Sequence, residues 1–278
     1  MKSMREPHMQ RISGATASDA IRSRAKRLDF DALLPVVSIL VLLILWKLIS
    51  LSVSERYVPS PEGTISTMVS VLLTGSTYHH LGATLARTVV GFALAMTLGI
   101  LVGTCMGLYR RGELLFRLPV VVGLTIPSLC YIIVTFMWFG LNERAAVAAV
   151  TLTTFPSIAV NIWAGVKAID GRLIGMAKVF GHNEQARMVR VVLPQVFPYI
   201  VAASRFGFGI VWKVVAVVEL LGMSNGVGYQ LNYYFQLFDI RSVFAWTLLF
   251  TLVMVVIELL ILKPLELRVF RWRPEVRA

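Results

Sequence analysis

The sequence predicts an all-α membrane protein with about six transmembrane helices. Hydrophobic residues make up 57% of its 278 residues and charged residues only 15%, a balance far more apolar than that of an ordinary soluble domain. The apolar residues gather in blocks of about twenty, long enough to cross a hydrocarbon core of roughly 30 Å as helix. Basic residues concentrate in alternate loops between these blocks. Each block can therefore be placed in turn.

Six blocks are expected to form a transmembrane domain over residues 33–262. They are Leu33–Leu51, Thr88–Leu108, Leu118–Gly140, Ala145–Val166, Val196–Leu221 and Val243–Leu262. A short surface helix is expected between the first two, from Glu62 to Leu73. The fifth block differs from the others because Arg205, Lys213 and Glu219 interrupt it. Charges inside a span are costly, so this helix should face protein or water instead of lipid.

The loops show a strong asymmetry in Lys and Arg. Twenty of these residues lie before the first block or after the second, fourth and sixth blocks, against four in the alternate loops. The richer side is expected to be cytoplasmic. The tails over residues 1–32 and 263–278 are therefore both predicted to be cytoplasmic. The net charge of +12 does not indicate nucleic-acid binding, because the basic residues do not form one face of a folded domain.

Small residues recur every four positions along the second block. They are Gly91, Ala95, Gly99, Gly103 and Gly107. A stripe of this kind lets another helix backbone approach closely. Structural packing is the favoured interpretation, and a sliding interface is the alternative.

The cytoplasmic stretch over residues 164–195 is expected to form a helical hairpin. Apolar residues recur at helical spacing in its first half, at Ile169, Leu173, Ile174 and Ala177. Gly181 can end that helix in a left-handed conformation, and Asn183 can cap the next one. Pro194 should close the hairpin before the fifth block.

The hairpin carries a family resemblance. Gly175-Met-Ala-Lys-Val-Phe-Gly181 followed by Val191-Val-Leu-Pro194 resembles the cytoplasmic signature of ATP-binding-cassette (ABC) importer permeases, Glu-Ala-Ala, three residues, Gly, then an apolar pair and Leu-Pro. Gly175 and Met176 depart from it, since the family usually has Glu and Ala there. Further fragments resemble the permeases for nitrate, taurine and aliphatic sulfonates: Trp138-Phe-Gly140, Asp170-Gly-Arg-Leu173, Glu219-Leu-Leu-Gly222 and Gly226-Val-Gly228.

The resemblance covers roughly residues 87–273 and implies the permease subunit of an ABC importer in a bacterial inner membrane. Such a subunit is expected to form the path for a small, anionic solute, similar to a sulfonate, taurine or nitrate, that a periplasmic solute-binding protein delivers. Its implied partners are two copies of an ABC ATPase and a second permease copy, in a homodimer. The sequence contains no phosphate-binding Gly-x-x-x-x-Gly-Lys-Ser/Thr loop, so ATP hydrolysis is expected on the separate ATPase. We expect no enzyme activity and no cofactor here.

A rival interpretation is a secondary transporter driven by an ion gradient. Such proteins normally show matching inverted halves with interrupted helices, and the sequence shows no such halves.

The candidate site residues form three groups. The hairpin is expected to couple to the ATPase through Gly175, Ala177, Gly181, Asn183, Leu193 and Pro194. The substrate path is expected to involve Arg205, Lys213 and Glu219. An outer gate is expected in the loop over residues 222–242, at Gly222, Gly226 and Gly228, because glycines permit sharp turns.

Two of the charges in the fifth block have alternatives. Lys213 could meet an anionic solute, or it could pair with Glu219 or Glu258. Arg205 is more readily explained as a structural anchor paired with a carboxylate. The adjacent pair His79 and His80 lacks the further ligands that a metal site needs, so no metal is expected.

Overall fold

The structure is a computed structural model that describes residues 15–269, with side chains from residue 33 to residue 268 apart from residue 266. Within this range the chain is helical and contains no strand. The elements are α1 (Ala15–Ser52), α2 (Pro61–Leu72), α3 (Gly75–Leu108), α4 (Arg110–Thr125), α5 (Ser128–Phe139), α6 (Glu143–Lys167), α7 (Gly171–Val179), α8 (Glu184–Arg187), η1 (Met188–Val192), α9 (Leu193–Gly222), α10 (Val227–Gln236), α11 (Ile240–Ile257), η2 (Glu258–Leu262) and α12 (Lys263–Val269). The chain divides into two compact units, Met1–Glu62 and Gly63–Ala278.

The first unit consists mainly of α1. Its segment Leu33–Ser52 is long and apolar enough to cross a membrane. Near the end of this segment, Lys47 Nζ donates to both carboxylate oxygens of Glu62 at 2.8 and 2.9 Å. This hydrogen bond holds the pKa of the Glu62 carboxyl below its usual range. The expected tail is helical from Ala15 onward, and residues 1–14 lie outside the described part of the chain.

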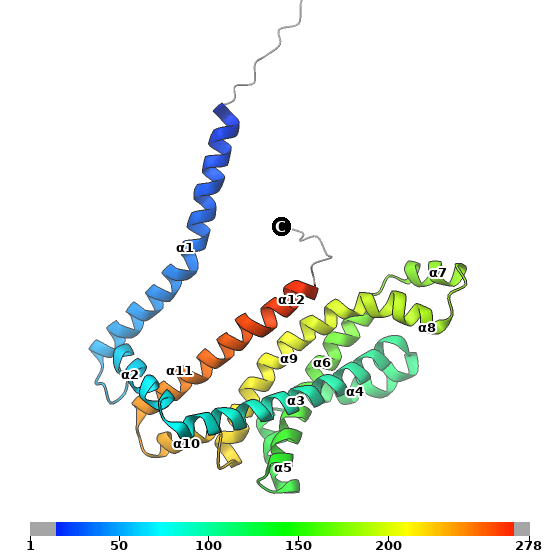
Figure 1. Cartoon of the computed structure of the whole chain (residues 1–278). Helices are drawn as coiled ribbons and strands as arrows, with labels where there is room; N and C mark the ends of the chain where they lie inside the picture. Colours follow the sequence, from blue (N-terminus) through cyan, green and yellow to red (C-terminus); the bar gives the residue numbers. More distant parts are fainter. Residues whose placement is uncertain (1–14, 270–278) are drawn as a thin grey trace, which may run out of the picture. The chain divides into compact units, whose positions relative to one another are not determined.

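The second unit is built around α3, α6 and α9 (Figure 1). The small-residue stripe of α3 packs directly on α6. A Cβ at Gly103 would lie 2.5 Å from the Ala159 carbonyl oxygen, and one at Gly91 would lie 2.7 Å from Val150 Cγ1. The structural interpretation of the stripe is therefore confirmed, because its partner is another helix of the same chain.

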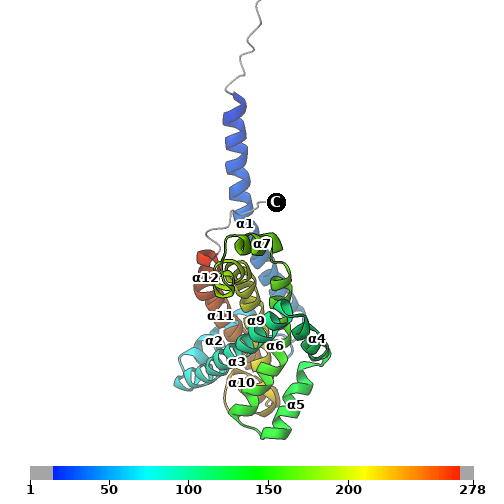
Figure 2. The ribbon, with the colours of Figure 1, turned by 90° about the vertical axis from the view of Figure 1, so that its right-hand side faces the viewer.

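The third apolar block is not a continuous helix, contrary to what its length alone indicates. It is broken into α4 and α5, which are bent by 100° (Figure 2). The cause is Pro127, which disfavours helical geometry in the residue before it; Ile126 is accordingly extended, with φ −71° and ψ 124°. Pro127 also lacks the N–H that would bond to the Gly123 carbonyl in a continuous helix. The Tyr131 hydroxyl donates to that carbonyl instead, at 3.1 Å.

Pro194 does not end the helix that precedes the fifth block. The segment Glu184–Gly222 runs on as one apolar helix through α8, η1 and α9. The turn before Pro194 widens to π geometry, in which the Leu193 N–H donates to the Met188 carbonyl five residues back. A widened turn gives the proline ring the space that a regular turn would deny it. The same arrangement recurs in η2, where the Lys263 N–H donates to the Glu258 carbonyl just before Pro264.

The described residues contain five helices long and apolar enough to cross a membrane, or six if α4 and α5 together form one span. The prediction of an all-helical membrane protein with about six spans is therefore confirmed. The second span is longer than expected, because α3 begins at Gly75 and not near Thr88. The short surface helix is α2, close to its expected bounds.

Candidate functional site

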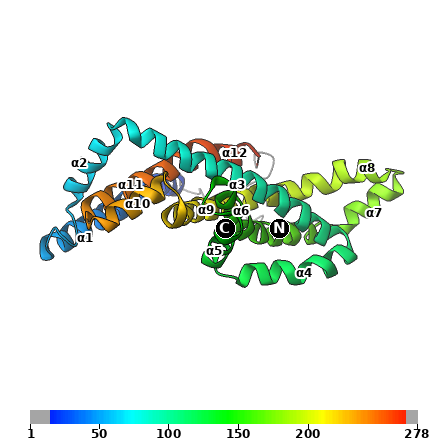
Figure 3. The same ribbon diagram turned by 90° about the horizontal axis from the view of Figure 1, so that it is seen from below.

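Most of the predicted site residues lie in two regions of the second unit, and Arg205 and Lys213 lie between them on α9. We call the region of α7, α8 and η1, over residues 170–195, the hairpin; Figures 1 and 3 show it at one end of the unit. The second region lies at the opposite end, where α3 begins, α6 begins and α9 ends. We call its central residues the ionic cluster: Arg87, Glu143, Glu219 and Asn225.

The hairpin has the turn that the sequence predicts. Asp170 caps α7 by accepting from the Arg172 N–H at 2.8 Å. Beyond Phe180, Gly181 has φ +74°. The Gly181 N–H donates to the Lys178 carbonyl at 3.0 Å and the His182 N–H to the Ala177 carbonyl at 3.1 Å. This pair of bonds is a Schellman motif, which needs a left-handed residue at the position that Gly181 occupies.

Asn183 begins the second arm of the hairpin. Its side-chain oxygen accepts from the Ala186 N–H at 2.8 Å, as expected of an N-cap. The base of the hairpin is closed by Gln195, whose side-chain oxygen accepts from the Asp170 N–H at 3.1 Å. Both arms therefore hold a defined geometry without a partner protein.

The apolar surface of the hairpin differs from the expected stripe. Ile169 and Ile174 pack on the core of the second unit, and Ala177 is buried. Ala177 therefore supports the hairpin mainly from inside. Of the expected stripe, only Leu173 is exposed. The other exposed apolar side chains of the hairpin are Met176, Val179, Phe180, Met188, Val189 and Leu193. Val179 is 87% exposed and Phe180 is 72% exposed, which is unusual for residues of this kind.

A groove of about 400 Å³ lies between the two arms of the hairpin, lined by Leu173, Met176, Ala177, Phe180, His182, Arg190, Val191, Pro194 and Gln195. Of the expected coupling residues, Pro194 lines this groove and Leu193 is exposed beside it. Gly175 faces open space, since a Cβ built on it would contact nothing within 4 Å. The hairpin thus presents a shaped apolar surface that no other described part of the chain covers.

Arg87 is the centre of the ionic cluster. Its side chain is only 2% exposed. Its Nη1 donates to Glu219 Oε1 at 2.7 Å and to the Asn225 carbonyl at 3.0 Å. Its Nε and Nη2 donate to the two oxygens of Glu143 at 2.8 and 2.5 Å, and Nη2 also donates to Asn225 Oδ1. One buried cation on α3 therefore holds α6, α9 and the segment that follows α9.

Glu219 is the buried anion of the ionic cluster, with a side chain 0% exposed. Besides the bond from Arg87, its Oε2 accepts from Thr84 Oγ1 and from the Gly228 N–H, both at 2.9 Å. Both oxygens are therefore satisfied, as a buried charge requires. The expectation that Glu219 lines a substrate path does not fit this burial, because every polar atom of its side chain is taken by the protein.

The expected gate glycines lie around Glu219. Gly226 has φ +112°, and a Cβ built on it would overlap the Glu219 carboxylate. A glycine is therefore required there by conformation and by space. The segment over residues 222–242 is not simply a loop, since its stretch Val227–Gln236 forms the helix α10. His80 on α3 fastens the start of α10, because its Nδ1 accepts from the Gly226 N–H at 3.1 Å.

The remaining charges of the fifth block are partly paired. Arg205 forms an ion pair with Glu258, the anchoring role considered first for it. Neither partner considered for Lys213 is available, since Glu219 pairs with Arg87 and Glu258 with Arg205. Lys213 has an exposed side chain and forms no ion pair with any described residue.

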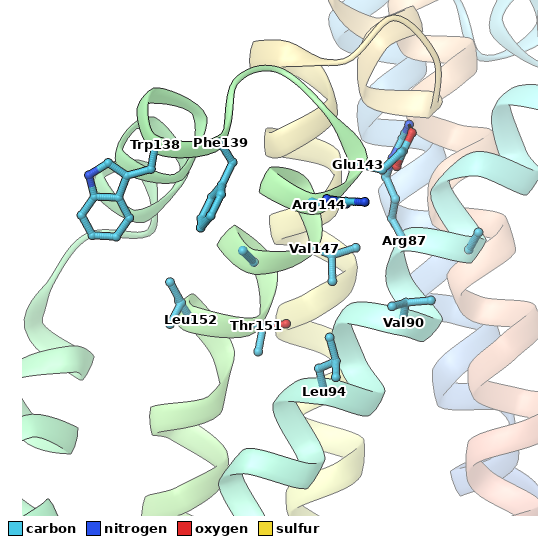
Figure 4. A pocket seen from close by; sticks show the side chains of 12 residues that line it. Arg87, Val90, Leu94, Trp138, Phe139, Glu143, Arg144, Val147, Thr151 and Leu152 are labelled. Atoms are coloured by element: carbon cyan, nitrogen blue, oxygen red, sulfur yellow. Dashed lines mark hydrogen bonds and ion pairs between the residues drawn. The ribbon is translucent and has the colours of Figure 1, made fainter.

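A groove of about 690 Å³ lies beside the ionic cluster, between α3, α5 and α6 (Figure 4). Its lining is mostly apolar, from Val90, Leu94, Trp138, Phe139, Val147 and Leu152. Figure 4 shows the side chains of Arg87 and Glu143 together at one end of this groove, with Arg144 close by and Trp138 on the far side.

The sequence did not identify Arg87 as a site residue. Its charge assigned it to a loop outside the second span, whereas α3 begins twelve residues earlier and buries it. The signal that could have found it is the need of Glu219 for a cation, since a carboxylate inside a span is costly when unpaired.

In the part of the chain that the structure describes, no group of three His, Cys, Asp or Glu side chains could hold a metal ion. His80 has a different role. Its ring contacts Gly226 and Gln230 and stacks on Tyr229, so it joins α3 to α10.

Comparison with known proteins places the chain in a family. Residues 95–265 match the model of the binding-protein-dependent transport system inner membrane component. A Bacillus subtilis protein described as an aliphatic sulfonates transport permease is 27% identical over 260 residues, covering 93% of this chain and 94% of the relative. The Escherichia coli taurine transport system permease protein is 24% identical over 251 residues, covering 88% and 91% of the two chains.

Solved structures show the same fold. A chain of a methionine ABC transporter in an inward-facing conformation is similar with a TM-score of 0.60 at 18% identity, covering 69% of this chain and 95% of that one. A chain of a bacterial alginate ABC transporter, solved with a pentasaccharide-bound periplasmic protein, has a TM-score of 0.57 at 15% identity and covers 92% and 98%. At these identities the likeness concerns the fold alone. The family match over residues 95–265 identifies this chain as a member of the binding-protein-dependent transport system inner membrane component family, the membrane-spanning permeases of ABC importers.

Proposed function

We propose that this permease carries a small solute with an anionic sulfonate group, such as taurine or an alkanesulfonate, delivered by a periplasmic binding protein and driven by an ABC ATPase. The names of two relatives that align over most of their length support this substrate class. The chain also offers a fitting cation, since Lys213 lies inside an apolar span with its side chain exposed.

The position of Lys213 is the observation that carries the solute path. Phe206, Lys213, Val217 and Leu220 are exposed on α9 and fall on one face of the helix, because they are spaced by seven, four and three residues. A bare ammonium on a lipid-facing surface is costly. This face of α9 is therefore better explained as the wall of a water-accessible path.

The path is expected to lie between two permease copies in a homodimer. Within one copy, side-chain packing closes the contacts between α3, α6 and α9, as the glycine contacts of α3 and the buried clusters around Ala95 and Val150 show. A second copy facing α9 would complete the wall that one copy leaves open.

The hairpin is proposed to dock on the ATPase. Its exposed side chains Met176, Val179 and Phe180 form an apolar surface on a rigid turn, and binding surfaces commonly present such patches. The docking surface would be formed by these residues together with Gly175, Gly181, Asn183, Leu193 and Pro194, while Ala177 supports it from inside. This proposal places the hairpin and both chain ends in the cytoplasm, in agreement with the basic residues of the loops.

The opposite end would then face the periplasm, and the ionic cluster would belong to the outer gate. Gly226 and Gly228 lie next to Glu219, so the segment between α9 and α10 is fastened through that carboxylate, and Gly222 packs against Phe136 and Leu141. A gate in this position would open by moving α10 relative to α3.

The test is uptake by proteoliposomes that contain the full-length chain and its ATPase, with the binding protein and labelled taurine added outside. We expect uptake to require both ATP inside and the binding protein. Lys213→Met should raise the KM or abolish uptake, and Lys213→Arg should retain it, because the cation is kept.

Two outcomes would contradict the proposal. Uptake driven by an ion gradient without ATP would favour the secondary-transporter alternative. Uptake of a neutral solute in preference to sulfonates, or normal taurine uptake by Lys213→Met, would refute the assigned substrate class or the assigned path.

A further inference from the structure

A cluster of cations lies where α4 begins and α6 ends, at the same end of the unit as the hairpin. Arg110 is the first residue of α4, and Lys167 is the last of α6. Arg117 lies seven residues after Arg110, on the same face of α4 because seven residues are close to two helical turns. These three cations belong to two helices that pack on each other.

A single aromatic ring and a single carboxylate organise the cations. The Arg117 guanidinium carbon and Lys167 Nζ each lie 5.9 Å from the centre of the Trp163 ring, within the range of a cation–π contact. Trp163 is held from behind by a buried cluster that includes Met106 and Val120. Glu113 accepts from Lys167 at 2.9 Å and lies 3.8 Å from Arg110.

The cluster carries more positive charge than its own residues neutralise. Glu113 is its one carboxylate, against Arg110, Arg117 and Lys167, which leaves an excess of two positive charges. Arg117 forms no ion pair with a described residue, and Arg110 is 79% exposed. Arg111 adds a further exposed cation beside them.

The surroundings are those of a membrane boundary. The apolar spans α3 and α6 end at Leu108 and Lys167. Leu114, Leu115 and Leu118 are each at least 65% exposed on α4, as is expected of side chains that contact acyl chains. An aromatic residue at the end of a span commonly lies at the level of the lipid head groups.

We propose that Arg110, Arg117, Lys167 and Trp163 bind the head group of an anionic phospholipid. The excess charge would hold the phosphodiester, and the leucines of α4 would contact the acyl chains. Basic pockets between transmembrane helices bind acidic head groups in this way. The site is independent of the solute path and of the substrate class.

The experiment is a lipid titration of the detergent-purified full-length chain, followed by native mass spectrometry. The probes are phosphatidylglycerol and phosphatidylcholine with identical acyl chains. Each cation near the surface contributes ~1 kcal/mol, or about fivefold in affinity. The excess of two positive charges therefore predicts an affinity ratio of about thirtyfold in favour of phosphatidylglycerol. Arg117→Gln should lower the ratio about fivefold, and Arg117→Lys should lower it less because the charge is kept.

The matched control is Arg144→Gln, which removes one exposed cation at the opposite end of the unit and should leave the ratio unchanged. If Arg117→Gln does not fold, Lys167→Gln tests the same site. Equal binding of the two lipids, or equal losses for Arg117→Gln and Arg144→Gln, would overturn the proposal. Displacement of phosphatidylglycerol by millimolar inorganic phosphate would show a site for free phosphate. Displacement by the ATPase would show a protein contact surface. Either result would also refute the lipid site.

Discussion

Glu219→Gln is the sharpest test of the ionic cluster, because it removes one charge and keeps the shape of the side chain. The amide oxygen can still accept from Arg87, but the amide nitrogen must take the place of Oε2. There it would face the Gly228 N–H, which now donates to Oε2 at 2.9 Å. A buried donor is then set against a donor, and Arg87 loses the one negative charge that is fully buried with it.

The expected cost follows from burial. Breaking a buried ion pair costs about 3–5 kcal/mol. For Glu219→Gln we expect a smaller cost of ~2–3 kcal/mol, because Arg87 keeps its pair with Glu143 and the amide oxygen of the new side chain still accepts a hydrogen bond from it. Glu143→Gln is the matched control, since it removes the same charge from the same arginine at a side chain that is 62% exposed. An exposed partner contributes at most ~1 kcal/mol.

Thermal unfolding of the purified full-length protein, followed by tryptophan fluorescence, gives the comparison. At about 2–4 °C per kcal/mol, we expect Glu219→Gln to lower the Tm by ~5–10 °C and Glu143→Gln by less than ~4 °C. Arg87→Gln should be at least as damaging as Glu219→Gln, because it leaves a bare carboxylate buried. The double variant that combines Arg87→Gln with Glu219→Gln should lose less stability than the sum of the losses in the two single variants. Equal Tm values for Glu219→Gln and Glu143→Gln would refute the reasoning.

Three further changes test other parts of the structure. Gly181→Val should cost about 1–2 kcal/mol at the left-handed turn and give a permease that inserts normally but loses ATPase retention or coupled uptake in pull-down and vesicle assays. Normal values of both would refute the docking role. Its control is Gly82→Ala, which enters open space in the helix α3, outside the hairpin. Gly226→Ala should lower the free energy of unfolding by more than the ~1–2 kcal/mol of its backbone strain, since its Cβ meets the Glu219 carboxylate. The measurement is the Tm, and a Tm equal to that of Gly175→Ala, which enters open space in a helix, would contradict this. Tyr131→Phe should cost about 1 kcal/mol by removing the donor to the Gly123 carbonyl, whereas Tyr199→Phe, whose hydroxyl bonds to no described residue, should leave the Tm unchanged; equal shifts would show that this bond does not support the bend.

The spans and the hairpin turn could be predicted because their causes are local. The length of an apolar run determines whether a helix can cross the membrane, and Gly181 with Asn183 contains the whole chemistry of its turn. The two proline effects were harder, although each cause is local as well. Pro127 breaks a helix and Pro194 only widens one. The difference depends on tertiary contacts that the sequence does not show, such as the Tyr131 hydroxyl at the freed carbonyl.

The ionic cluster could not be predicted from local pattern, since Arg87 and Glu219 lie 132 positions apart. Charge counting placed Arg87 with the loops and Glu219 with a path, because each was considered alone. A charge at Arg87 and a charge at Glu219 can both be buried only if the two residues form a pair. A cation just before one span and an anion near the same end of another each avoid a large desolvation cost by pairing. Similar reasoning could have predicted Glu258 as the ion-pair partner of Arg205, and this is the pair observed.

One helix joins the two candidate sites. The segment Glu184–Gly222 is 39 residues long, or about 58 Å at roughly 1.5 Å per residue. Its first turn is an arm of the hairpin, and its last turn carries Glu219. A displacement of the hairpin by a docked partner would therefore reach the ionic cluster through a single continuous element, with the π turn at Met188–Val192 as its first irregularity. Because Glu219 holds α3 through Arg87 and α10 through Gly228, rotation of this helix would strain both contacts together. Variants of Gly181 and of Glu219 are thus expected to affect the same step of transport, although their side chains lie at opposite ends of the protein.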